Sequence, residues 1–295
     1  MKRITFAIAA YNHEKFVLES LESVWNDGYP HKEIVIIDDG SSDNTPDIIK
    51  RWCIEKNWAE ISYHTGPNAG ITATLNKLIA ASTGDYIRLV SSDDLLVPGG
   101  TKKLAAVLDA DPGAMAVFGD AILIDGAGGK IGDSTLIANG ADKRRLAHPD
   151  LLTGEIIQNW SVSGPVVLIR RDFYLKSGSY DETLLVDDWD LYLRIAAIDG
   201  LRFVDSSVAK YRIHGLNTSR TIETRKRIAN LLSQVRVAQT NVSLFTKPNI
   251  RYLLTAERYL LLAKSAYLSN GWIKCGSYLL LYLGHRVRAH LSKTK

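Results

Sequence analysis

The stretch Leu89-Val90-Ser91-Ser92-Asp93-Asp94 passes from apolar residues to two serines and two adjacent carboxylates. The apolar run 86–90, which overlaps its beginning, predicts a buried strand. Two unpaired carboxylates are costly to bury, and a divalent cation with oxygen ligands is the simplest partner for them. The stretch therefore predicts a metal and diphosphate site at Asp93 and Asp94. The alternative is that one of these polar residues caps a helix near Pro98, and the stretch alone favours that alternative.

Two earlier strands end in the same kind of polar loop. Residues 4–10 are mostly apolar and precede Tyr11-Asn12-His13-Glu14. Residues 33–37 are β-branched after Glu33 and precede Asp38-Asp39-Gly40-Ser41-Ser42-Asp43-Asn44. Strands that are apolar throughout are typical of parallel sheets covered on both faces. Open sheets of this kind bind ligands at the carboxyl ends of their strands. Capping and turn formation account for Asp43 and Asn44, but less well for Asp38 and Asp39.

Strands and helices alternate as far as residue 118. Predicted helices separate five predicted strands, which cover residues 4–10, 33–37, 61–64, 86–90 and 114–118. This order predicts an α/β fold with a Rossmann-like, mostly parallel sheet and helices on both faces. The first strand is not followed by Gly-x-Gly-x-x-Gly, and the chain has no Walker lysine motif. A dinucleotide oxidoreductase or a P-loop enzyme is therefore disfavoured.

The alternation of strands and helices becomes irregular between residues 120 and 159, where the sequence predicts mainly loops. Long loops on a rigid scaffold often carry substrate-specific contacts. A strand at 165–169 and two edge strands at 201–204 and 208–213 are predicted beyond this region. Between them, Asp187-Asp188-Trp189-Asp190 opens a strongly periodic helix. Three acids around a tryptophan are more than the helix dipole requires.

Residues 221–295 are predicted to form a basic helical extension to a catalytic domain at 1–220. The extension holds 13 Lys and Arg residues against two acids, whereas the whole chain has a net charge of only +4. Three helices are predicted at 222–245, 250–268 and 272–291. The last two carry Leu and Tyr faces with interspersed Arg and Lys. Such helices suit contact with an anionic membrane surface through residues 250–291, or packing on the core or on a second subunit. The sequence leaves both alternatives open, and with them a homo-oligomer.

The composition is that of an ordinary globular protein, 46% hydrophobic and 23% charged. The two cysteines, Cys53 and Cys275, offer neither a disulfide framework nor a zinc spacing, so a reducing cytoplasm is the expected compartment. The apolar run 4–10 is short for a signal peptide and is better interpreted as a strand. No apolar run approaches the roughly 18 residues that span a bilayer. No nucleic-acid-binding module occurs, so nucleic acid is not an expected partner.

Together these segments resemble glycosyltransferase family 2, whose members have the GT-A fold. The resemblance covers about residues 3–220 and rests on six motifs in the family's order: Ala9-Ala10-Tyr11-Asn12, the loop 36–45, Asn68-x-Gly70 with Asn76, Ser91-Ser92-Asp93-Asp94, Asp187-Asp188-Trp189-Asp190-Leu191, and Tyr211-Arg212-x-His214-x-x-Asn217-x-Ser219. Two residues depart from the family pattern. Ser92 replaces the first aspartate of Asp-x-Asp, and Leu75 stands where an arginine is common.

The resemblance implies an inverting transferase that moves a sugar from a nucleotide diphosphate sugar, preferably a UDP-sugar, to a hydroxyl group of a glycan or lipid-linked glycan. Asp188 would be the catalytic base that deprotonates this hydroxyl group. Asp94 and His214 would hold Mn²⁺ or Mg²⁺ against the leaving diphosphate. The carboxylate of Asp39 suits the N3–H donor of uracil. The nucleotide-binding residues would be Ala9, Tyr11, Asn12, Asp39, Asn68, Gly70 and Asp93.

Two other functions compete with this one. Ser92 and Leu75 would also fit a weakly active or inactive homologue that acts as a binding or scaffold subunit of a glycan assembly complex, although such a protein has no need of Asp188. A nucleotidyltransferase would need a glycine-rich, basic loop after the first strand, which the chain lacks. The setting expected for the transferase is bacterial surface polysaccharide synthesis, in the cytoplasm or peripherally on the inner face of the plasma membrane.

Overall fold

The computed structural model describes residues 1–185, 188–215, 217 and 222–292, which belong to two compact units. The first unit comprises Met1–Gly140, Ser161–Tyr180 and Gly200–His214, and the second comprises Ala141–Trp160, Asp181–Asp199 and Gly215–Lys295. The sequence predicts a division after residue 220, because the charge composition changes there. The two units of the structure are instead defined by which residues contact one another. Two earlier segments therefore join the C-terminal helices in the second unit.

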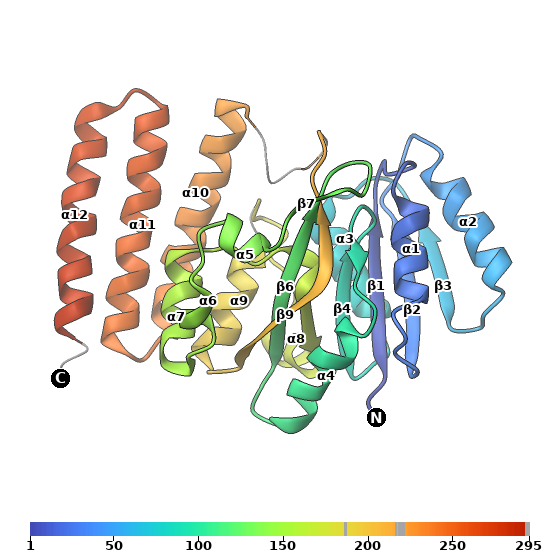
Figure 1. Ribbon diagram of the computed structural model, residues 1–295. Coiled ribbons are helices and arrows are strands. Elements are labelled where there is room, and N and C mark those ends of the chain that lie inside the picture. The colour runs from blue at the N-terminus through green and yellow to red at the C-terminus, as the bar shows by residue number, and fades with distance from the viewer. Residues whose placement is uncertain (186–187, 216, 218–221, 293–295) are drawn as a thin grey trace. The chain divides into compact units, whose positions relative to one another are not determined.

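The first part of the first unit is a parallel sheet with strands in the order β3-β2-β1-β4 (Figure 1). These strands are β1 (Ile4–Ala10), β2 (Lys32–Asp38), β3 (Ile61–Thr65) and β4 (Tyr86–Ser91). The helices that connect them are α1 (Val17–Trp25), α2 (Thr45–Lys56) and α3 (Ile71–Ala81). The predicted alternation of strands and helices is confirmed in this region.

The sheet continues beyond β4 with mixed strand directions. Its path runs through β8 (Val167–Arg170), β6 (Ala116–Ile124), β9 (Leu201–Arg212) and β5 (Leu95–Leu96), and β7 (Lys130–Gly132) pairs with β6. β8 is antiparallel to β4 and β6, whereas β6 and β9 are parallel. The helices α4 (Gly100–Ala110), α5 (Thr135–Ala138) and α8 (Arg171–Ser177) and the short turn η1 (Gly164–Val166) complete this unit. Most paired residues lie in parallel ladders, as the predicted fold class requires.

A single strand replaces the two predicted edge strands near the end of the first unit. Strands were predicted at 201–204 and 208–213, but β9 runs through both ranges and lies between β6 and β5. The edge-strand prediction was wrong, because the polar residues 205–207 do not end the strand. Instead, the ladder between β6 and β9 shifts register near Asp120, an irregularity that absorbs the interruption.

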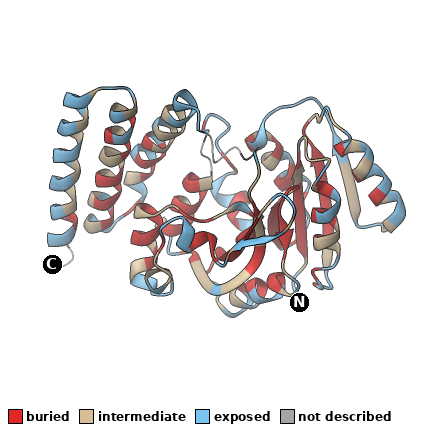
Figure 2. Ribbon diagram, turned by 45° about the horizontal axis from the view of Figure 1, so that its top comes forward, coloured by how far each residue is buried: buried red, intermediate tan, exposed pale blue. Residues whose placement is uncertain are grey.

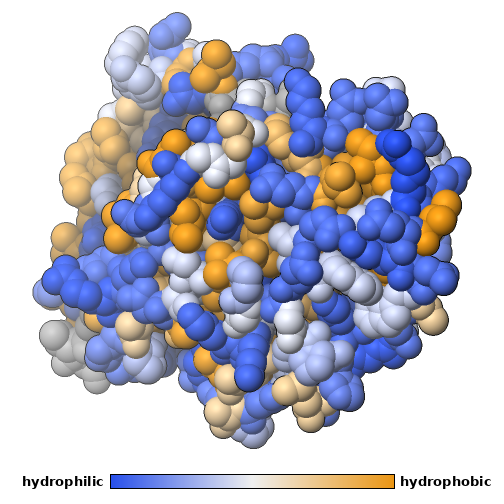
Figure 3. Space-filling model, turned by 45° about the vertical axis from the view of Figure 1, so that its right-hand side comes forward, coloured by the Kyte–Doolittle hydropathy of each residue, from blue (hydrophilic) through white to orange (hydrophobic). Residues whose placement is uncertain are grey.

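The strands of this unit are covered on both faces. Every residue of β1 except Ala9 is buried, although successive side chains of a strand point to opposite faces. In β2 only Lys32 is partly exposed. Figure 2 shows these strands as buried elements beneath helices with exposed outer surfaces. The face shown in Figure 3 is mostly hydrophilic, with apolar residues gathered in small patches. The core of the first unit therefore lies between its sheet and the helices on either side.

The second unit is helical. It contains α6 (Lys143–Leu146), α7 (Pro149–Gln158), α9 (Asp188–Ala197), α10 (Thr224–Asn241), η3 (Val242–Leu244), α11 (Pro248–Leu268) and α12 (Trp272–Leu291). The three helices predicted after residue 221 are confirmed as α10, α11 and α12. Among the described residues, no helix combines the length and the apolarity needed to cross a membrane.

The prediction of mainly loops at 120–159 was wrong. After β6 and β7 the chain forms three short helices, α5, α6 and α7. The helices α5 and α6 have a single turn each, too short for an apolar period to show, and are capped by the side chains of Ser134 and Asp142. The helix α7 begins at Pro149 and continues through Gly154, a poor helix former that weakens the helical signal in the sequence. Local caps in α5 and α6, and a proline in the first turn of α7, therefore mark these helices better than periodicity does.

The first turn of α9 packs within the second unit. Trp189 is buried, and its indole N–H donates to the carbonyl of Ile156 over 3.2 Å. The carboxylate of Asp190 accepts hydrogen bonds from Asn241 at 2.7 Å and from Arg194 at 2.9 Å. Trp189 and Asp190 therefore have structural roles in this unit.

Candidate functional site

Polar loops follow three neighbouring strands at one edge of the sheet. Ala10 of β1 pairs with Asp38 of β2, and Ala9 pairs with Ser91 of β4. Because the three strands are parallel and end at the same level, the residues that follow them share one edge of the first unit. This edge contains the loops after β1, β2 and β4.

The loop after β2 binds the loop after β3. The two carboxylate oxygens of Asp39 accept backbone N–H bonds from Ala69 at 2.9 Å and from Gly70 at 3.0 Å. Gly40 has φ +77°, and a Cβ there would lie 2.7 Å from the backbone nitrogen of Asn68. Only glycine permits both the positive φ and this close approach. The structure thus brings together three of the predicted nucleotide-binding residues, Asp39, Asn68 and Gly70.

The loop after β1 is tied to the same region. Asn12 has φ +52°, in the left-handed region. Its backbone N–H donates to Ser41 Oγ, and its side-chain oxygen accepts from the N–H of Ser42. Both hydrogen bonds are 2.8 Å long. Tyr11 is 46% exposed, and Ala9 is partly exposed at the end of β1. Asn12 therefore shapes the loop, whereas Tyr11 and Ala9 are accessible to a ligand.

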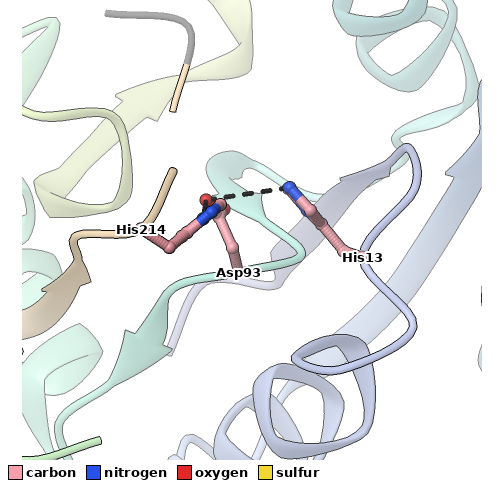
Figure 4. A group of neighbouring side chains, drawn as sticks. All are labelled: His13, Asp93 and His214. Atoms are coloured by element: carbon pink, nitrogen blue, oxygen red, sulfur yellow. Dashed lines mark hydrogen bonds and ion pairs between the residues drawn. The ribbon is translucent and has the colours of Figure 1, made fainter. Parts of the chain in front are cut away.

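Three titratable side chains from distant parts of the sequence converge at this edge: His13, Asp93 and His214 (Figure 4). His214 Nε2 lies 2.9 Å from Asp93 Oδ2, and His13 Nε2 lies 3.9 Å from the same oxygen. One ligand atom from each residue lies within 4.8 Å of the others. Two imidazoles and one carboxylate at this spacing can hold a divalent metal ion.

The sequence did not single out His13 as a site residue, although it stands two residues after Tyr11 in the loop that follows the first strand. His13 Nδ1 lies 2.8 Å from Ser92 Oγ, a contact that orients the ring. Burial lowers the pKa of His13 below its ordinary value, although the nearby Asp93 carboxylate opposes this effect. A neutral imidazole is the form that binds metals, so the environment suits a ligand.

Asp94 makes different contacts from Asp93. It is buried, and its Oδ1 accepts the backbone N–H of Arg212 at 2.9 Å. Burial raises the pKa of Asp94 well above its usual range, and the adjacent Asp93 carboxylate raises it further. The sequence predicts that His214 and Asp94 are metal ligands together, whereas in the structure His214 forms a hydrogen bond with Asp93.

Arg212 holds the end of β9 against the loop after β4. Its buried guanidinium donates from Nε to the carbonyl of Asp93 at 2.8 Å and from Nη2 to Glu19 at 2.6 Å. It also lies over the ring of Phe16, 5.0 Å from the ring centre. These contacts fix the backbone of Asp93 and the strand end that leads to His214. In the sequence Arg212 was noted only as part of a motif. The structure shows that it positions the Asp93 backbone.

The predicted catalytic base belongs to the second unit. Asp188 is the first residue of α9, is half-buried, and accepts the backbone N–H of Trp189 at 2.8 Å. Its neighbour Asp187 lies outside the described residues, as does Ser219 of the last motif. The role of Asp188 as a base stays a prediction.

Asn76 has a structural role in the first unit. Its side-chain oxygen accepts the N–H of Tyr180 at 2.9 Å, and its amide donates to the carbonyl of Tyr180 at 3.1 Å. This pair of bonds joins α3 to the segment after α8. The motif that contains Asn76 therefore combines loop residues at the candidate site with a residue that stabilises the fold.

Known proteins resemble the chain in sequence. The model of Glycosyl transferase family 2 matches residues 5–173, more than half of the chain. The chain is 23% identical to chondroitin synthase of Pasteurella multocida (strain Pm70) over 248 residues, and 27% identical to poly-beta-1,6-N-acetyl-D-glucosamine synthase of Staphylococcus aureus (strain COL) over 198 residues. These alignments cover 82% and 66% of this chain but 24% and 47% of the two relatives. The chain thus spans about a quarter to a half of the length of these relatives.

Solved structures share the fold of the chain. The mannosyltransferase PcManGT from Pyrobaculum calidifontis, in complex with GDP-Man and Mn²⁺, has a TM-score of 0.61 and 16% identity, with 97% of this chain and 87% of that chain covered. Residues 1–349 of TarS from Staphylococcus aureus, in complex with UDP-GlcNAc, have a TM-score of 0.61 and 14% identity, with 96% and 91% covered. At these identities the likeness shows the fold alone, which is GT-A. The family match and the fold together establish that the chain belongs to glycosyl transferase family 2.

Proposed function

We propose that this chain transfers a sugar from a nucleotide diphosphate sugar to a hydroxyl group of a glycan acceptor, with inversion at the anomeric carbon. The observation that carries the proposal is the convergence of His13, Asp93 and His214 beside the loops that follow β1, β2 and β4. Relatives named as polysaccharide synthases, and related structures bound to nucleotide sugars, support it.

The loop residues around Asp39 favour a UDP-sugar as donor. Each carboxylate oxygen of Asp39 accepts one backbone N–H, which leaves lone pairs for the N3–H donor of uracil. Tyr11 offers an exposed ring on which a base can stack. The remaining residues proposed to border the nucleotide are Ala9, Asn12, Asn68 and Gly70.

The cluster of His13, Asp93 and His214 fits a divalent cation. Two imidazoles and one carboxylate suit Mn²⁺ better than Mg²⁺, which prefers an all-oxygen shell. Asp94 is the further ligand expected from the family motif, and its Oδ1 accepts the backbone N–H of Arg212. When bound, the cation would offset the negative charge of the departing diphosphate. The protein holds the ligands in place through Ser92, which orients His13, and Arg212, which fixes the Asp93 backbone.

Asp188 is the proposed catalytic base. The backbone N–H of Trp189 orients its carboxylate at the start of α9. The ionised carboxylate would take the proton of the acceptor hydroxyl while the oxygen attacks the anomeric carbon on the face opposite the diphosphate. This direct displacement gives a β-linked product from an α-linked donor. General-base assistance of this kind typically contributes about 10²- to 10⁴-fold in rate.

We also propose the acceptor class and the setting of the reaction. The relatives named above synthesise chondroitin and poly-N-acetylglucosamine, so a free or lipid-linked bacterial surface glycan is the proposed acceptor. Such a glycan would be extended at the inner face of the plasma membrane.

A donor screen tests this function. Thermal unfolding is measured with a panel of UDP- and GDP-sugars, each with and without Mn²⁺, because ligands that bind the folded chain raise its Tm. The donor should raise Tm only with Mn²⁺ and should be hydrolysed or transferred, and NMR of the anomeric proton would show inversion. If no sugar nucleotide stabilises the chain or is turned over, the proposal fails. Binding of a sugar nucleotide without hydrolysis would favour the alternative that the chain is a scaffold subunit. Turnover that persists in EDTA would show that the reaction does not need the metal.

A further inference from the structure

The helix α12 is exposed over most of its surface. Only Ala289 is buried among its 20 residues, and Figure 2 shows the helix as exposed along most of its length. Six large apolar side chains are more than half exposed, namely Trp272, Ile273, Leu280, Leu283, Val287 and Leu291. A helix on the surface of a globular domain normally directs polar residues to solvent. The composition of this surface therefore needs an explanation.

These six residues, called the apolar face of α12 below, lie on one side of the helix. With 3.6 residues per turn they fall within an arc of about 100°. Tyr278 and His285 lie on the opposite side of the helix, and both stack on Tyr259 of α11, with ring centres 6.4 and 5.4 Å apart. The apolar face therefore points away from α11.

Basic residues accompany this face. The helices α10, α11 and α12 together carry ten Lys and Arg residues and one acid, Glu257, which is buried. The helix α12 contributes Lys274, Arg286 and Arg288 and has no acid. By helical position, Arg286 and Arg288 border the apolar face on its two sides. The surface of α12 therefore combines exposed apolar area with positive charge.

We propose that the apolar face of α12 docks on a membrane surface that contains anionic lipids. An amphipathic helix with basic borders can place its apolar side chains at the acyl boundary and its Lys and Arg side chains among the lipid phosphates. A second copy of the chain would bring like charges together with no acid on α12 to pair with them, so charge complementarity favours the lipid surface. The contact would be peripheral, because none of the described helices can cross a membrane. This inference rests on α12 alone and does not depend on the proposed transferase activity.

Vesicle co-sedimentation of the full chain tests the proposal. The chain should bind vesicles of phosphatidylcholine mixed with phosphatidylglycerol, bind phosphatidylcholine alone far more weakly, and dissociate at high salt. The triple variant Leu280→Ser/Leu283→Ser/Val287→Ser should lose at least about tenfold in partitioning, since it removes three insertable side chains. The double variant Arg286→Gln/Arg288→Gln should lose roughly 25-fold on anionic vesicles, about fivefold for each basic residue.

A matched control removes the same number of exposed apolar side chains from the first unit. Ile54, Ile131 and Leu175 are 73%, 54% and 65% exposed, so Ile54→Ser/Ile131→Ser/Leu175→Ser should bind vesicles like the parent chain. A cooperative thermal unfolding transition would confirm that each variant is folded. Donor-induced stabilisation, measured on the same variants, reports on the transferase proposal separately.

Three outcomes would overturn the inference. The first is no binding of the parent chain to anionic vesicles. The second is undiminished binding of the triple variant. The third is a dimer in light scattering that the triple variant converts to a monomer while neither binds vesicles, which would assign the apolar face to a second copy. Loss of vesicle binding in both α12 variants, with the control unchanged, would support the membrane contact.

Discussion

Substitution of Arg212 should damage both the stability of the first unit and its candidate metal site. The guanidinium is buried and donates to the Asp93 carbonyl at 2.8 Å and to Glu19 at 2.6 Å, while the backbone N–H of Arg212 binds Asp94. Arg212→Met keeps the backbone bond and an apolar side chain of similar reach but removes every guanidinium donor. The carbonyl of Asp93 then loses the hydrogen bond from the guanidinium. The carboxylate of the same residue is the group that forms a hydrogen bond with His214.

The size of the effect can be estimated from these contacts. The side chain of Glu19 is 55% exposed, so solvent screens its ion pair, which contributes at most about 1 kcal/mol. The hydrogen bond from the charged Nε to the buried Asp93 carbonyl contributes about 1.5–3 kcal/mol. The bonds to the carbonyls of Asp125 and Gly126 are long, at 3.4 and 3.3 Å, and add little. The expected loss is about 2–4 kcal/mol, or roughly 5–15 °C in Tm.

Calorimetry and Mn²⁺ titration measure the two consequences. Arg212→Met should lower Tm as estimated and weaken Mn²⁺ binding by about 10- to 100-fold, the usual effect of losing a residue that orients a metal ligand. Arg202→Met is the matched control, because Arg202 lies on the same strand and pairs with the partly exposed Asp111 at 2.8 Å. The control should leave Tm and Mn²⁺ affinity nearly unchanged. A stability loss for Arg212→Met no larger than that of the control, or an unchanged Mn²⁺ affinity, would refute the positioning role.

Changes at three other side chains separate metal binding, catalysis and pH dependence. His13→Gln should weaken Mn²⁺ binding in a titration, whereas His31→Gln, at an exposed histidine, should not; equal affinities would exclude His13 as a ligand. Asp188→Asn should lower kcat by about 10²- to 10⁴-fold while the donor still raises Tm. Normal turnover of this variant would show that Asp188 is not the base. Burial raises the pKa of Glu257 from 4.5 to about 7, so the folded chain binds an extra proton between these values and its stability falls as pH rises through them. Glu257→Gln should abolish that fall and be more stable than the parent by about 3 kcal/mol at alkaline pH. Parallel stability profiles of the two proteins in chemical denaturation at acid and alkaline pH would contradict the Glu257 prediction.

Much of the first unit could be predicted from sequence because its signals are local. The strands β1 and β2 have apolar central segments, and turn residues separate each strand from the next helix. The alternation of these elements is enough to indicate a parallel sheet. The prediction failed where structure depends on caps or on pairing. One-turn helices such as α5 and α6 have no period to detect, and β9 continues past its polar residues because β6 pairs with it.

The sequence by itself determined that polar, acidic loops follow the strands of an α/β sheet, since period and turn chemistry are read over a few residues. It also determined the order of the motifs that mark the family. Only the tertiary structure decided that Asp93 rather than Asp94 meets His214, and that His13 joins them. Adjacent residues of a turn point in different directions according to backbone dihedrals that sequence patterns do not specify. Residues as distant as His13 and His214 become neighbours only when the sheet and the register of β9 are in place.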